Sequence, residues 1–229
     1  MLKFTPILLA ILYALAMYRF SAWRLGHELD AKSTELADPV LKRLTDRMAD
    51  ALDVARIRVN IYEVEPVNGL AAPDGRIFIT RGFYNQYRQG LVSAEELSSV
   101  IAHELGHVAL GHSRRRMIDF SGQNALRTAL AMVLSRFLPG FGVQVAGALT
   151  SLLAARLSWS DEYEADAYAS ALLVKAGIGT APQKSLFSKL ESLTAARGAM
   201  PAWFMSHPKK DERIAAIEAN EAKWGLERD

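Results

Sequence analysis

The stretch His103-Glu104-Leu105-Gly106-His107 dominates the interpretation of this chain. In an α-helix, residues four apart lie one turn apart on the same face, so His103 and His107 could bind one ion. Glu104 would lean toward the same pocket without being a ligand, and there it could take a proton from water. The pattern is typical of zinc-dependent hydrolases, although histidines that only hydrogen-bond in a core could share this spacing.

The neighbouring residues predict that this stretch lies on a buried helix. Ser93 and Glu96 have the spacing of a capping box, with Ser93 as the N-cap and Glu96 at the third helical position. Gly111 supplies a C-terminal stop. Apolar residues repeat at helical spacing along the segment and would bury the rest of it: Leu97, Val100, Ile101, Leu105 and Val108.

A third metal ligand has to come from another part of the chain. The chain contains no cysteine, which excludes thiolate ligands. His112 follows His107 by five residues, which is about 140° around a helix, so it could not share the ion. We interpret His112 as a helix-end or surface histidine.

The acidic stretch 160–166 is the remaining candidate, and it would open a second helix that ends at Gly177. Glu162 and Asp166 are four residues apart and share a helix face. Glu162 could therefore bind zinc while Asp166 accepts the outer N–H of a ligating histidine. The alternative is a solvated acidic helix start, which the helix dipole favours, and we interpret Glu164 in that way.

Together, these motifs resemble the membrane-associated zinc metallopeptidases that include the HtpX-type heat-shock proteases and the CaaX prenyl proteases. In their gluzincin pattern, a ligand glutamate and a supporting aspartate follow the histidine motif, and these match Glu162 and Asp166. Residues 68–82 resemble the family's strand and turn before the catalytic helix. The stretch Ser206-His207-Pro208, followed by Arg213-Ile214, resembles its C-terminal His-Pro element.

The resemblance implies one zinc ion per chain, held by His103, His107 and Glu162, with Glu104 as the general base. It also implies a mostly helical α+β fold, namely a gluzincin-like metalloprotease domain with a small sheet beside the helix of the His103–His107 motif. His207 would stabilise the oxyanion of the reaction, as its counterpart is thought to do in the family. A turn histidine ahead of a proline is the alternative for His207.

Pattern and composition give a coarse view of the other elements. Residues 38–52 read as an amphipathic helix with four apolar side chains inward: Val40, Leu41, Leu44 and Met48. Strands are expected at residues 57–62 and 76–80, and helices at 184–194 and 209–223. With 229 residues and 50% hydrophobic content, residues 31–229 would form one metallopeptidase domain.

Two apolar regions bear on membrane attachment. Residues 4–18 carry no charge, so we expect residues 1–24 to be a signal-anchor or a cleaved signal peptide. Residues 125–157 are expected to form an apolar helical hairpin inserted in the domain. Arg136 and the Pro and Gly residues of 138–142 favour packing on the core or the membrane surface over insertion.

These observations predict a zinc-dependent endopeptidase that acts on unfolded or membrane polypeptides in envelope quality control. We place it at a bacterial inner membrane, in contact with lipid and with its catalytic domain in the periplasm, or free in the periplasm if the signal is cleaved. The competing hypothesis is a zinc-bearing chaperone or adaptor without proteolysis, for which Glu104 would be unnecessary. A net charge of +2 with dispersed basic residues argues against nucleic-acid binding.

Overall fold

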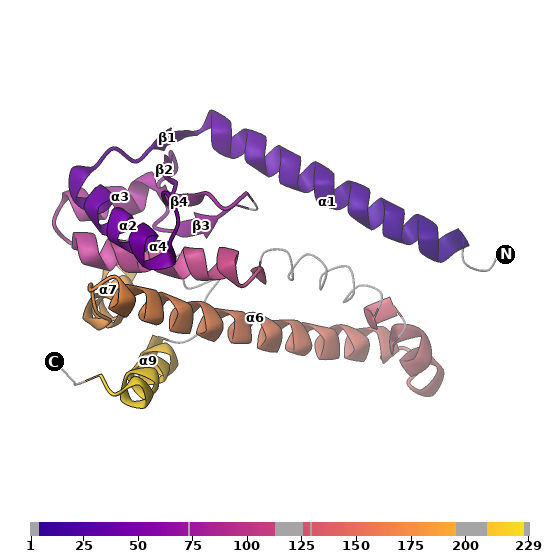
Figure 1. The fold of residues 1–229 in the computed structure, drawn as a ribbon. Helices are drawn as coiled ribbons and strands as arrows, with labels where there is room; N and C mark the ends of the chain where they lie inside the picture. Colours follow the sequence, from indigo (N-terminus) through magenta and orange to yellow (C-terminus); the bar gives the residue numbers. More distant parts are fainter. Residues whose placement is uncertain (1–4, 73, 113–125, 129, 196–209, 227–229) are drawn as a thin grey trace. The chain divides into compact units, whose positions relative to one another are not determined.

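The computed structural model describes residues 5–72, 74–112, 126–128, 130–195 and 210–226 (Figure 1). The chain divides into two compact units, which are considered separately below. Unit 1 comprises Met1–Lys32 and Ser113–Ser158, and unit 2 comprises Ser33–His112 and Trp159–Asp229. Most described residues are helical and the strands form one small sheet, which confirms the predicted α+β class.

Unit 2 contains a four-stranded sheet with the strand order β1-β2-β4-β3. The strands are β1 Ser33–Glu35, β2 Val59–Tyr62, β3 Gly69–Ala71 and β4 Ile77–Thr80. Strands β2 and β4 run parallel, whereas β1 and β3 pair antiparallel with their neighbours. The predicted strands correspond to β2 and β4, and the two short outer strands were not expected, because three residues give too little pattern to recognise.

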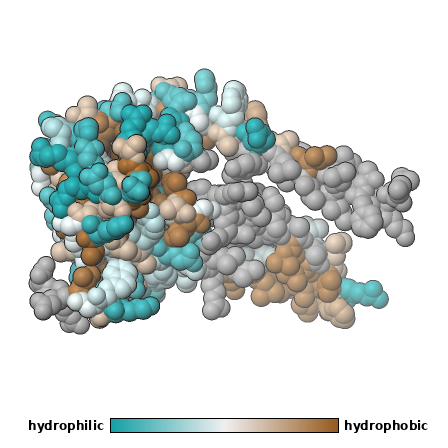
Figure 2. Space-filling view, in the orientation of Figure 1, coloured by the Kyte–Doolittle hydropathy of each residue, from teal (hydrophilic) through white to brown (hydrophobic). Residues whose placement is uncertain are grey.

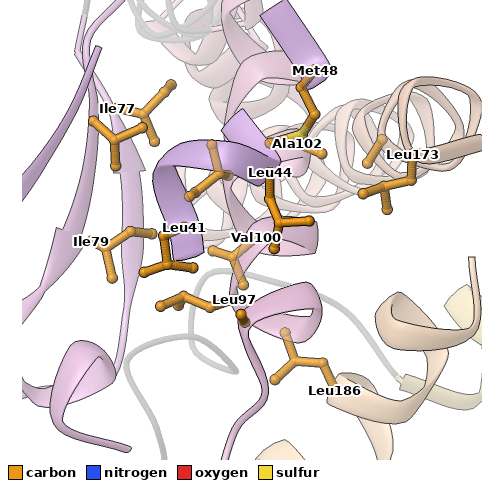
Figure 3. Packing of buried hydrophobic residues seen from close by; sticks show 14 of the residues in the cluster. Leu41, Leu44, Met48, Ile77, Ile79, Leu97, Val100, Ala102, Leu173 and Leu186 are labelled. Atoms are coloured by element: carbon orange, nitrogen blue, oxygen red, sulfur yellow. The ribbon is translucent and has the colours of Figure 1, made fainter. Parts of the chain in front are cut away.

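Helix α4, Ala94–Ala109, lies at the centre of unit 2 and contacts the sheet and three further helices. The other helices that lie wholly within the described part of unit 2 are α2 Pro39–Leu52, α3 Arg81–Arg88, α7 Ala181–Ala195 and α9 Lys210–Trp224. Figure 3 shows Leu97 and Val100 of α4 facing Ile79 of β4, with Leu41 of α2 beside them. All four side chains are buried, so α4 is held on several sides by apolar packing.

The predicted start and buried face of α2 agree with the structure except at one residue. The Asp38 carboxylate accepts hydrogen bonds from the N–H groups of Val40 and Leu41 and caps the helix. The prediction that Val40 points inward is wrong, since 36% of it is exposed. Val40 lies in the first turn of α2, next to the inward-facing Leu41. It is therefore at the border of the buried face of the helix.

Helix α6, Gly142–Lys175, begins well before the acidic stretch. The expectation that residues 160–166 open a helix is therefore wrong. Residues 142–158 contain few charged groups but many good helix formers, and they continue into the acidic segment without a break. Consequently Glu162 and Asp166 lie in the interior of a long helix, where no free N-terminal dipole would account for acidic side chains.

Unit 1 contains α1, Thr5–Ala31, and an apolar helical region. Residues 130–137 are helical, residues 138–141 form a turn, and α6 follows. A Cβ atom at Gly142 would lie 2.3 Å from the backbone nitrogen of Ser135, so this turn requires glycine there. Across the residues that the structure describes, no helix is both long and apolar enough to span a lipid bilayer.

Candidate metal centre and active site

Helix α4 carries the three predicted site residues of the His103–His107 motif. Its start is fixed by the predicted capping box: the Ser93 hydroxyl accepts the Glu96 N–H at 3.1 Å, and the Glu96 carboxylate accepts the Ser93 N–H at 2.8 Å. The side chains of His103, Glu104 and His107 are all buried, because the helix is enclosed by the sheet and neighbouring helices.

Gly106 allows α6 to approach the motif closely. A Cβ atom at this position would lie 3.0 Å from both the Cα and the carbonyl oxygen of Ala165. A side chain at Gly106 would thus press on the backbone of the neighbouring helix. The absence of one permits Glu162, one turn before Asp166, to reach the histidines of α4.

Three side chains converge between α4 and α6: His103, His107 and Glu162. His103 Nε2 and His107 Nε2 are 3.1 Å apart. The Glu162 carboxylate places one oxygen 3.3 Å from His103 Nε2 and the other 3.5 Å from His107 Nε2. Tetrahedral zinc with bonds of about 2.0–2.1 Å requires ligand atoms roughly 3.3–3.4 Å apart. The donor set and its spacing therefore fit a single zinc ion, and these three residues could hold one.

Asp166 lies behind His103. Its carboxylate is 2.9 Å from His103 Nδ1, the ring nitrogen that faces away from the converging atoms. Arg213 of α9 donates to both oxygens of the same carboxylate from Nε and Nη2, each at 2.6 Å. The guanidinium also lies over the ring of Phe187, with its carbon 4.2 Å from the ring centre. The His103 ring is thus held by a buried carboxylate that is itself held by a buried cation.

These contacts change the protonation of the buried groups. Burial alone lowers the pKa of His103, but hydrogen bonds to Asp166 and Glu162 outweigh it and raise the pKa to about 9. Burial alone raises the pKa of Asp166, whereas the charge of Arg213 and hydrogen bonds from Arg213 and His103 hold it below its ordinary value. In the metal-free protein His103 therefore carries a proton at neutral pH, which a metal ion must displace.

Glu104 lies beside the sheet edge. A Cβ atom at Gly69 of β3 would lie 3.3 Å from both Cγ and Oε1 of Glu104. Strand β3 is the last strand of the sheet on this side and pairs through its other edge with β4. The carboxylate therefore stands next to the place where an extended chain could add to the sheet.

His112 and Glu164 differ from their predicted environments. His112 follows the end of α4, as one of its two predicted alternatives has it. The other alternative, a surface histidine, is wrong, because His112 is fully buried with its Nδ1 2.9 Å from His107 Nδ1. Gly111 adopts a left-handed conformation with φ of 69°, which ends the helix and redirects the next residue. Glu164 is half-exposed, yet one of its carboxylate oxygens is 3.3 Å from His112 Nε2.

His207 lies outside the described residues, as does the rest of the Ser206-His207-Pro208 stretch. Sequence reasoning noted Arg213 only as part of the His-Pro element and gave it no role. The sequence did contain a signal: an arginine in a predicted amphipathic helix needs a buried acidic partner if its side chain faces inward. The direction of the Arg213 side chain could not be predicted, because it depends on how α9 packs against α6.

Two histidines and a glutamate around one point, with a further buried glutamate beside a sheet edge, define the site of a metallopeptidase. Comparison with known proteins agrees with this class. A model of Peptidase family M48 matches residues 35–221. Because this match spans most of the chain, the protein belongs to Peptidase family M48 and is a metalloendopeptidase.

Several curated relatives are similar over most of their length. Metalloprotease LoiP of Escherichia coli (strain K12) is 29% identical over 204 residues, which cover 87% of this chain and 78% of the relative. Metalloprotease YcaL of the same strain is 27% identical, covering 84% of this chain and 72% of the relative. A Protease HtpX homolog of Bordetella avium (strain 197N) is 29% identical, with coverages of 75% and 67%.

Proposed function

We propose that this metalloendopeptidase depends on one zinc ion held by His103, His107 and Glu162. The observation that carries the proposal is the spacing of their ligand atoms, between 3.1 and 3.5 Å. Zinc bound there would lower the pKa of a water molecule to about 7 and polarise the substrate carbonyl. Asp166, held by Arg213, keeps His103 in the tautomer whose Nε2 is available for the metal.

Glu104 is proposed as the general base and later the general acid. Its carboxylate is buried next to the histidines, so it can accept a proton from the attacking water and pass it to the leaving amine. His207 is proposed to stabilise the oxyanion, a role that rests on the family resemblance alone. The catalytic step thus uses two groups of this chain, one for the proton and one for the developing charge.

The proposed substrate is an extended stretch of an unfolded polypeptide. Strand β3 is short, lies at the sheet edge and passes within van der Waals reach of Glu104 through Gly69. A peptide pairing with this edge would bring its carbonyl groups past the carboxylate in a regular register. Most backbone groups of a folded domain are already paired, which favours unfolded proteins as substrates.

Membrane attachment at the periplasmic side of a bacterial inner membrane is proposed as the location. Residues 4–18 are uncharged, and Figure 2 shows an apolar surface over the hairpin region of unit 1. Exposed apolar side chains there include Met132, Phe137, Phe141 and Leu152, each about 70% exposed. Apolar groups of this size on a soluble surface are unfavourable, so lipid contact would stabilise them.

The test is hydrolysis of an unfolded protein such as casein by the Glu104→Gln variant. The amide cannot accept a proton, so hydrolysis should fall by two or more orders of magnitude, while zinc content and fold remain. Glu95→Gln is the matched control, since Glu95 lies on the same helix with its side chain exposed. A Glu104→Gln variant that hydrolyses casein at the wild-type rate would contradict the proposal. Wild-type protein that suppresses aggregation without cleavage would support the chaperone hypothesis instead.

A further inference from the structure

His112 occupies a position behind His107 that corresponds to the position of Asp166 behind His103. It is fully buried, and its Nδ1 lies 2.9 Å from Nδ1 of His107. The Nε2 atom of His107 faces the converging ligand atoms, 3.1 Å from His103 Nε2. His112 therefore contacts the ring nitrogen of His107 that a metal ion would leave unused.

The distances allow one tautomer assignment along this chain of groups. If His107 binds through Nε2, its proton resides on Nδ1, and that N–H must donate to an acceptor. The His112 atom that lies within hydrogen-bond distance of it is Nδ1. To accept this hydrogen bond Nδ1 must be unprotonated, so the proton of neutral His112 resides on Nε2. That N–H faces a carboxylate oxygen of Glu164 at 3.3 Å, with an oxygen of Asp161 at 3.8 Å.

We infer that His112 is a positioning residue that orients His107 and fixes its tautomer, and that Glu164 fixes the tautomer of His112. The inference rests on the proposed zinc site. His112 would thus orient His107 in the same way that Asp166, held by Arg213, orients His103. Partners of this kind change metal affinity about 10–100-fold when they are removed.

The backbone at the end of α4 places His112 there. The helix ends at Ala109, and the N–H of Gly111 donates to the carbonyl of Val108 at 3.1 Å. The positive φ of Gly111 then turns the chain back so that residue 112 returns beneath His107. An added Cβ at Gly111 would contact nothing within 4 Å, so the glycine serves this conformation and not a close approach.

The experiment compares zinc affinity, measured by chelator competition, in wild type, His112→Leu and His112→Asn. Leucine fills similar space without an acceptor, and we expect it to weaken zinc binding about 10–100-fold. The side-chain oxygen of asparagine can replace Nδ1 as the acceptor, and we expect the affinity to remain within a few-fold of wild type. Urea unfolding of the zinc-free variants serves as the stability control. Equal affinities in the Leu and Asn variants would overturn the inference.

A second measurement does not depend on any variant folding. The ¹⁵N chemical shifts of the imidazole rings in zinc-loaded wild type distinguish protonated from unprotonated ring nitrogens. We expect His112 to be protonated at Nε2 and unprotonated at Nδ1, and the opposite assignment would overturn the inference.

If wild type binds zinc but His112→Leu leaves affinity unchanged, only this inference fails. If wild type binds no zinc, the proposed function itself fails.

Discussion

Replacing Arg213 by methionine tests whether the buried ion pair behind His103 holds the site together. The guanidinium and the Asp166 carboxylate each expose only 2% of their side chains and share two hydrogen bonds of 2.6 Å. Removing one partner of a buried pair leaves an uncompensated charge and costs about 3–5 kcal/mol. For a chain of this length, that loss corresponds to a decrease of roughly 6–20 °C in the melting temperature.

The assay is urea unfolding of the zinc-free protein at neutral pH, for Arg213→Met, Asp166→Asn and the double variant. The Arg213→Met and Asp166→Asn changes should not add, because each removes the same pair. The stabilisation by Asp166 is fully present above its ordinary pKa of 3.8 and is lost as pH falls below that value, since its pKa is lowered in the folded protein. Zinc affinity of the Arg213→Met variant should fall as well, because Asp166 loses its anchor.

The matched control is Arg81→Met. Arg81 forms an equally close two-bond contact with Glu63, at 2.8 and 2.6 Å, but the two side chains are 32% and 38% exposed. Water screens such a pair, so its loss should cost about 0–1 kcal/mol. The reasoning is refuted if Arg213→Met costs no more than Arg81→Met, or if the effects of the Arg213 and Asp166 variants are additive.

Two further predictions concern protons and the membrane. Because the pKa of metal-free His103 is raised to about 9, zinc must displace its proton, and apparent zinc affinity should fall about tenfold per pH unit below pH 9. The metal-free fold should in turn lose stability as pH rises from 6.5 to 9, and a pH-independent zinc affinity across this range would disprove the assignment. Removing residues 1–30 should move the protein from the membrane fraction to the soluble fraction without loss of casein hydrolysis. Retention in the membrane fraction would show that the hairpin of unit 1 suffices for attachment, and a mature chain that begins at Met17 would indicate a cleaved signal instead.

Local patterns in the sequence predicted the parts of the site that depend on helix geometry. The capping box at Ser93 and the spacing of His103 and His107 follow from the regular repeat of a single helix. The same rule placed Glu162 and Asp166 on one face of α6. That these faces of α4 and α6 lie against each other was suggested only by the family resemblance. The spacing of residues within one helix carries no information about which helix packs against it.

Predictions from local patterns were wrong where they depended on the position of a helix end. His112 was assigned to a helix end or the surface because helical angles were continued past Gly111, whose left-handed conformation turns the chain back toward His107. The stretch 160–166 was expected to open a helix, and a dipole-stabilised helix start was the alternative considered for its acidic residues, although α6 had begun at Gly142. In the first case a rule that holds within a helix was applied past its end, and in the second a rule about helix ends was applied to a helix interior.

The amino-acid pattern alone was enough to predict the class of chemistry, from two histidines and a glutamate on one buried helix and two acidic side chains on one face of a second helix. The groups that surround these residues became known only from the packing of the elements. The contacts of His103 with Asp166 and Arg213 join residues 63 and 110 positions apart, and Arg213 comes from a third helix. Such contacts depend on how closely helices pack, and Gly106 permits that approach through an interaction with a backbone 59 residues away, Ala165. Helical periodicity extends over a few turns, whereas the buried charges that orient the ligands are selected by packing across the whole of unit 2.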